Sequence, residues 1–158
     1  AESIPLPDAS VDAVVAGQAY HWFDQARAHP EVARVLRPGG TFAAIWNTRD
    51  ESVAWVAELT RVAHLLDGTG ESQPNATSFG PLFGPIERRN FHQSVQHTGE
   101  SLLALLHSRS YYLTGSPAEQ AGIDARVRAL VATHPQLAER ERFELPYLTE
   151  VHRAIRRD

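Results

Sequence analysis

The chain has 158 residues, of which 42% are apolar and 22% charged, and its net charge is −4. This composition is ordinary for a globular protein, and the slight acidity gives no electrostatic case for nucleic-acid binding. With no cysteine and no apolar run near the roughly 18 residues of a membrane span, disulfides, thiolate metal sites, a cysteine nucleophile and a membrane segment are excluded. We expect a cytoplasmic protein.

The N-terminal residues predict a loop, a strand and a helix. Turn formers dominate 1–10, and the β-branched run 11–16 (VDAVVA) is typical of a strand buried on both faces. Asp24 is a candidate cap for a helix that runs to Leu36. Pro30 lies inside this helix, so we expect a kink there or a short first segment.

A second strand and a second helix follow. Residues 38–40 (PGG) are predicted to end the first helix, because proline cannot continue it and glycine accepts a left-handed cap. Residues 41–46 (TFAAIW) predict another buried strand. Residues 48–51 (TRDE) have the form of a capping box, which would open an amphipathic helix reaching Leu66.

The second half predicts a long loop and then strands and helices. Glycine and proline are frequent over 67–85, which we expect to be a loop. Residues 86–98 predict a strand and 101–108 a helix. Residues 116–119 (SPAE) combine a cap, a proline at the first helical position and a capping glutamate, which predicts a helix that ends near 134. Residues 143–151 alternate in polarity, as a final strand does.

This order of elements predicts an α/β fold. Two strands joined by a helix require parallel pairing through a right-handed crossover, whereas the last strand follows a chain reversal and is expected to be antiparallel. We expect a single domain over 1–158. It would comprise a strand-helix core at 1–66, the loop at 67–85, and C-terminal strands with helices at 86–158.

Four segments carry a family pattern, in order and at matching spacing: 1–14 (AESIPLPDASVDAV), 18–24 (QAYHWFD), 34–40 (RVLRPGG) and 143–151 (FELPYLTEV). They resemble class I S-adenosylmethionine-dependent methyltransferases, in particular a small-molecule subgroup (methyltransferase type 11) that includes trans-aconitate methyltransferases. The resemblance implies a partial Rossmann-like sheet that corresponds to strands four to seven of the family.

The sequence departs from this family at its donor site. The glycine-rich E/D-x-G-x-G-x-G loop and the acidic residue after the second family strand do not occur in it. We therefore expect the C-terminal portion of a methyltransferase, with the N-terminal strands missing. By this resemblance the intact protein methylates a small organic acceptor, whereas this chain is inactive and binds S-adenosyl-L-methionine weakly or not at all.

The resemblance also implies cofactor-binding residues. Ala1 and Glu2 match the family loop beside the adenine ring, although a frayed terminus is the alternative. Gln18 and Ala19 follow the first strand, at the sheet edge where ligands bind in open α/β folds, and are expected to approach the cofactor.

Candidate acceptor residues lie on two segments. His21 is a candidate general base because its pKa lies near neutrality, and Trp22 would face the acceptor. The alternative is that aromatic residues over 20–23 pack against the following helix. Tyr111 and Tyr112 would line the acceptor pocket, with packing again the alternative.

A second function hypothesis is a non-catalytic domain that oligomerises. The apolar strand 11–16 would expose an edge, and such edges pair with other chains, so we expect a homo-oligomer. Metal binding is not expected. His92 and His97 fall on opposite faces of a predicted strand, and no paired-ligand spacing occurs among the eight histidines.

Overall fold

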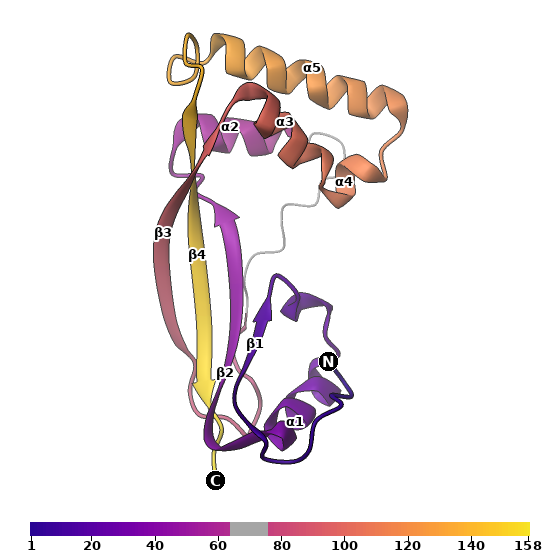
Figure 1. The fold of residues 1–158 in the computed structure, drawn as a ribbon, viewed down its shortest axis with the longest axis vertical. Helices are drawn as coiled ribbons and strands as arrows, with labels where there is room; N and C mark the ends of the chain where they lie inside the picture. The colour runs from indigo at the N-terminus through magenta and orange to yellow at the C-terminus, as the bar shows by residue number, and fades with distance from the viewer. Residues whose placement is uncertain (64–75) are drawn as a thin grey trace. The chain divides into compact units, whose positions relative to one another are not determined.

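The computed structural model describes residues 1–63 and 76–158, and the predicted alternation of strands and helices is confirmed there (Figure 1). The predicted continuation of the second helix over 64–66 and the predicted loop over 67–75 lie outside the described residues. In chain order the elements are β1 (Val11–Gly17), the 3-10 turn η1 (Tyr20–Trp22), α1 (Gln25–Val35), β2 (Leu36–Arg49), α2 (Ala54–Ala63), β3 (Glu87–His97), α3 (Gly99–His107), α4 (Ser110–Leu113), α5 (Pro117–Thr133) and β4 (Phe143–Ile155).

The strands form one sheet in the order β1-β2-β4-β3. β1 and β2 are parallel and joined through α1, which confirms the predicted crossover unit. Their register shifts once, because Val11 pairs with Leu36 whereas Ala13 already pairs with Thr41. Two steps along β1 therefore correspond to five along β2, and the extra residues of β2 form a bulge.

The glycines of the PGG segment explain this bulge. The prediction that this segment ends the first helix is wrong, because α1 ends at Val35 and residues 38–40 belong to β2. Gly39 has a φ of +76°, in the left-handed region. A Cβ at Gly40 would lie 2.8 Å from the carbonyl oxygen of Arg37 and 3.1 Å from that of Asp12. The bulge thus brings the backbone at Gly40 closer to that of Arg37 and Asp12 than a side chain would permit.

β4 is antiparallel to β2, as predicted. The amide of Arg156 donates to the carbonyl of Gly40 at 2.8 Å. Seven residues further along β2, Asn47 Oδ1 accepts a hydrogen bond from Thr149 Oγ1 at 3.1 Å. β2 thus advances from 40 to 47 as β4 recedes from 156 to 149. The last strand in the sequence is an interior strand of the sheet, between β2 and β3.

The capping box predicted over 48–51 is wrong. Thr48 belongs to β2, which continues to Arg49. The following turn is held by Asp50, whose Oδ1 accepts hydrogen bonds from the amide of Ser52 at 3.1 Å and from its hydroxyl at 2.6 Å. The pairing of β2 with β4 therefore carries the strand past the residue that the local pattern marks as a cap.

The capping box at Ser116 is confirmed and opens α5. Glu119 Oε2 accepts the amide of Ser116 at 2.7 Å, and the amide of Glu119 donates to Ser116 Oγ at 3.4 Å. Pro117 occupies the first helical turn, where no amide hydrogen is needed. The predicted end near 134 is also correct, since α5 ends at Thr133.

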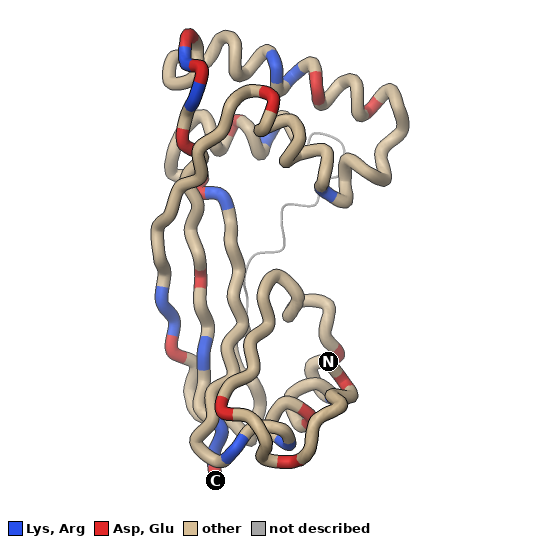
Figure 2. Tube along the Cα trace, in the orientation of Figure 1, with Lys and Arg blue, Asp and Glu red and all other residues tan. Residues whose placement is uncertain are grey.

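The described residues cluster into two compact units. Unit 1 holds 1–48, 76–91 and 149–158, and unit 2 holds 49–63 and 92–148. The core of unit 1 consists of Ala16, Tyr20, Val32, Ala33, Leu36, Phe42, Ala44, Trp46, Ala76, Phe79, Phe83 and Ala154. Figure 2 shows basic and acidic residues interspersed along the chain.

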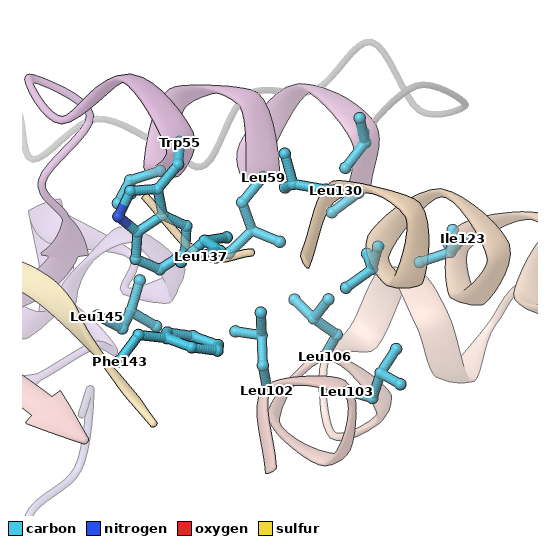
Figure 3. Packing of buried hydrophobic residues seen from close by; sticks show 14 of the residues in the cluster. Trp55, Leu59, Leu102, Leu103, Leu106, Ile123, Leu130, Leu137, Phe143 and Leu145 are labelled. Atoms are coloured by element: carbon cyan, nitrogen blue, oxygen red, sulfur yellow. The ribbon is translucent and has the colours of Figure 1, made fainter. Parts of the chain in front are cut away.

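The core of unit 2 forms where α2, α3, α5 and β4 meet (Figure 3). Leu59 of α2, Leu106 of α3 and Val127 of α5 are fully buried in it. Trp55 packs its indole edge-on against Phe143 of β4, with ring centroids 5.5 Å apart. In the part of the chain that the structure describes, no helix is long and apolar enough to cross a bilayer.

Candidate cofactor and acceptor site

The carboxyl ends of β1 and β2 bring polar groups together in unit 1. Gln18 follows β1 with a φ of +51°, which is uncommon for a residue other than glycine. Its amide donates to the carbonyl of Ile45 at 2.9 Å, and its side-chain Nε2 donates to the carbonyl of Asn47 at 2.8 Å. Two hydrogen bonds thus hold this backbone conformation, with the carboxamide fixed across the ends of the two strands.

The turn η1 separates a buried side chain from two exposed ones. Trp22 and Phe23 donate their amides to Ala19 and Tyr20, at 3.0 and 3.1 Å. Tyr20 is only 2% exposed, whereas Trp22 is 80% exposed and His21 is also exposed. The packing alternative therefore holds for Tyr20 but not for Trp22. His21 and Trp22 lie side by side at the surface, with ring centroids 4.9 Å apart.

The opening segment is attached to α1 rather than frayed. Glu2 Oε1 accepts the amide of Asp24 at 2.9 Å, directly after the η1 turn. The amide of Ile4 donates to Glu31 Oε1 at 2.7 Å. The structure therefore places Glu2 beside the segment that carries the other cofactor-binding candidates, and Ala1 is its immediate neighbour.

Arg34 of α1 is the centre of this attachment. It pairs with Glu31 at 2.8 Å and with Asp8 at 2.5 Å, and it donates to the carbonyls of Leu6 and Ile4 at 2.9 and 3.0 Å. The hydrogen bonds that Glu31 accepts, first from Arg34 and then from the amide of Ile4, lower the pKa of its carboxyl to about 2. An ionised Glu31 is thus part of what fixes residues 4–8.

The two tyrosine candidates lie in unit 2. Tyr111 and Tyr112 are half-buried and pack against its apolar core, as the packing alternative expects. The ring of Tyr112 stacks on His107 at 4.3 Å, and His107 Nε2 lies 2.9 Å from Asp124 Oδ1. Burial, and secondly the Asp124 carboxylate, raises the pKa of Tyr112. Their assignment to an acceptor pocket stays a prediction.

Sequence reasoning did not find His29, which lies within α1. Its Nε2 is 3.0 Å from the hydroxyl of Tyr20, and burial lowers its pKa. Nothing in the local pattern marks His29, because its partner approaches only when the η1 turn packs on the helix. Trp46, which ends the second predicted strand, is 3% exposed and serves packing.

Metal ligands do not gather in this part of the molecule. Across residues 1–63 and 76–158, no group of three or more histidine or carboxylate side chains is arranged to hold an ion. What the site offers instead is a polar strand edge with an exposed imidazole and an exposed indole beside it.

The fold and the polar strand ends together define a Rossmann-like α/β protein. A family model described as a methyltransferase domain matches residues 1–44. An uncharacterized methyltransferase of Mycobacterium tuberculosis is 44% identical over 154 residues, covering 98% of this chain and 62% of the relative. One from Schizosaccharomyces pombe is 32% identical over 152 residues, covering 94% and 61%.

A solved structure is also similar. It is a candidate type II methyltransferase from Anaeromyxobacter dehalogenans, with a TM-score of 0.57 and 25% identity, and the match covers 96% of this chain and 66% of that one. Over nearly all of its residues the chain is therefore similar to methyltransferases, in sequence and in fold. It spans about three fifths of the length of the two curated relatives.

Proposed function

We propose that the protein is a cytoplasmic enzyme that transfers a methyl group from S-adenosyl-L-methionine to a small organic acceptor. The observation that carries this proposal is the polar edge at the ends of β1 and β2, in a chain related to methyltransferases over nearly its whole length. The family uses this donor, and the carboxyl edge of an open α/β sheet is where such ligands bind.

The residues at this edge suit the donor. Glu2, Gln18 and Ala19 present a carboxylate, a fixed carboxamide and backbone groups, which suit the hydrogen-bonding edge of an adenosine. The exposed indole of Trp22 suits a sulfonium, because a cation is attracted to an aromatic face. His21, beside it, is our candidate to accept a proton from the acceptor.

We further propose that these 158 residues bind the donor weakly and are inactive alone. The glycine-rich motif of the family does not occur among them, and it supplies the main contacts to the methionine part of the donor. Saturation-transfer NMR with S-adenosyl-L-methionine, which carries the sulfonium, detects such weak binding. We expect a signal from the adenine protons that falls when Gln18 or Trp22 is replaced by alanine.

Arg128→Ala is a matched control for these variants, because Arg128 is an exposed residue of unit 2. It should leave the signal unchanged. Absence of a saturation-transfer signal from the ligand with the unsubstituted chain would refute the donor site. Micromolar binding would refute the proposed weakness.

A second candidate function is a non-catalytic domain that forms a homo-oligomer. It is favoured by the position of β1, which lies at one edge of the described sheet and has Val15 60% exposed. Apolar edge strands pair with other chains, and lysine on an edge prevents this. Sedimentation velocity should show a dimer that Val15→Lys dissociates. A monomer at all concentrations would exclude this function.

A further inference from the structure

Tyr20 lies at the centre of an aromatic cluster in unit 1. Its ring is 2% exposed, although its neighbours in sequence, His21 and Trp22, are at the surface. Ring centroids within 6.1 Å of that of Tyr20 belong to Phe23, His29, Phe42, Trp46 and Phe79. The η1 turn is therefore anchored through the one side chain that points inward.

The hydroxyl of Tyr20 is satisfied within this cluster by His29 of α1. The oxygen lies 3.0 Å from His29 Nε2, and the two rings are nearly parallel at 12° with centroids 5.9 Å apart. Without such a partner, a buried phenol would destabilise the folded state, because its hydroxyl would lose its hydrogen bonds to water and gain none in the protein. The hydrogen bond thus ties the turn after β1 to the middle of the helix that follows.

Among residues 1–63 and 76–158, few other hydrogen bonds close this turn. The cap residue Ala19 has no side-chain group that accepts a hydrogen bond. The turn is closed by two hydrogen bonds, which the backbone amides of Trp22 and Phe23 donate. The side chains of His21 and Trp22 bury little surface. The conformation that displays them depends on what Tyr20 contributes from inside.

We infer that Tyr20 is a positioning residue, whose hydrogen bond to His29 holds Ala19, His21 and Trp22 in place at the end of β1. Its role in methyl transfer rests on the proposed function of that edge. The hydrogen bond itself can be tested without any ligand, so the two ideas stand or fall separately.

Hydrogen exchange at the amides of Trp22 and Phe23 reports on the turn directly, because both amides close it. Tyr20→Phe removes only the hydroxyl and keeps the ring. We expect it to accelerate exchange at these two amides by roughly fivefold to tenfold, as loss of one buried hydrogen bond implies. His29→Leu should have the same effect, and the double variant should add nothing further.

Two comparisons separate positioning from general loss of stability. His29→Gln keeps a polar atom near Tyr20 and should restore at least half of the protection that His29→Leu removes. Tyr112→Phe, an equivalent change in unit 2, should leave exchange at Trp22 and Phe23 as it is. Global unfolding is followed through amides of the α5 interior, so a variant that merely unfolds more often accelerates those amides equally.

The inference is overturned if Tyr20→Phe leaves the Trp22 and Phe23 amides as protected as before. It is also overturned if their exchange only follows that of α5, or if the two single effects add in the double variant. Titration with S-adenosylhomocysteine then tests the consequence, an affinity about fivefold lower for Tyr20→Phe. Absence of binding by the unsubstituted chain would count against the donor site and leave the exchange result to decide about Tyr20.

Discussion

The close approach at Gly40 predicts a strong and specific sensitivity to an added methyl group. In Gly40→Ala, the new Cβ would lie 2.8 Å from the carbonyl oxygen of Arg37, 3.1 Å from that of Asp12 and 3.0 Å from Leu36 Cδ2. Two of these atoms are backbone, and the Leu36 side chain is fully buried, so none can move away cheaply. We expect a loss of about 2–3 kcal/mol in the free energy of unfolding, the upper part of the range for overpacking.

Two other glycines of the same strand pair serve as controls. Gly39→Ala meets open space but must keep a φ of +76°, which costs about 1–2 kcal/mol. Gly17→Ala meets nothing within 4 Å and needs no positive φ, so its effect should stay within about 0.5 kcal/mol. All three variants add the same methyl group, so the order of their losses in unfolding free energy depends only on what the new Cβ meets and on the backbone conformation.

Urea unfolding followed by circular dichroism measures these differences. With a slope of about 2 kcal/mol per molar urea, Gly40→Ala should lower the midpoint by about 1 M, and Gly17→Ala should leave it nearly unchanged. If Gly40→Ala unfolds at the same urea concentration as Gly17→Ala, the bulge is not as tight as described. The reasoning from the Cβ distances would then be wrong.

Three further predictions concern charge and exposure. Because Glu31 has a folded pKa of about 2 against a usual 4.5, its contribution to stability is present above pH 4.5 and lost as the pH falls toward 2. Proteolysis within residues 1–10 should therefore accelerate over this pH range in the unsubstituted chain, and this dependence on pH should be weaker in Glu31→Gln. Burial, and secondly Arg88, lowers the pKa of His152, so the imidazole resists protonation in the folded state. The free energy of unfolding of the unsubstituted chain, measured in urea relative to that of His152→Gln, should therefore decrease as the pH falls from about 7.5 to about 5.5. Trp22→Ala should change stability by less than about 0.5 kcal/mol, whereas Trp55→Ala should cost about 3–5 kcal/mol in the same titration, and equal costs would contradict the burial described for the two side chains.

The elements that the sequence predicts well are those specified by neighbours along the chain. The box at Ser116 and Glu119 opens α5 because both partners lie within one turn of helix. The parallel pair β1 and β2 follows from two apolar runs with a helix between them. Local rules suffice in these places because the interactions themselves are local.

The misplaced capping box at Thr48 shows where local rules end. β2 runs through Thr48 because it pairs with β4, as the contact between Asn47 and Thr149 shows, across 102 residues of sequence. No pattern within a few residues of Thr48 contains that information. A non-local strand pairing therefore overrides a plausible helix start.

In the candidate site, too, the local sequence predicts some features, whereas others depend on non-local contacts. The sequence places Gln18, His21 and Trp22 at the end of a strand, but a run of aromatic residues has no period that says which side chain is inside. The structure turns Tyr20 inward and Trp22 outward. The partner of Tyr20, His29, is found only once the turn has packed on α1.

The strand order also has a consequence for synthesis. β1, α1 and β2 leave the ribosome before β3 and β4 and can associate while translation continues, at about 5–20 residues per second. β3 pairs with β4 rather than with β2, so it must wait some fifty residues for the strand that joins it to the sheet. A nascent chain stalled before Phe143 would display β3 without β4, its neighbour in the described sheet, and at this stage a chaperone that binds extended segments would be most useful.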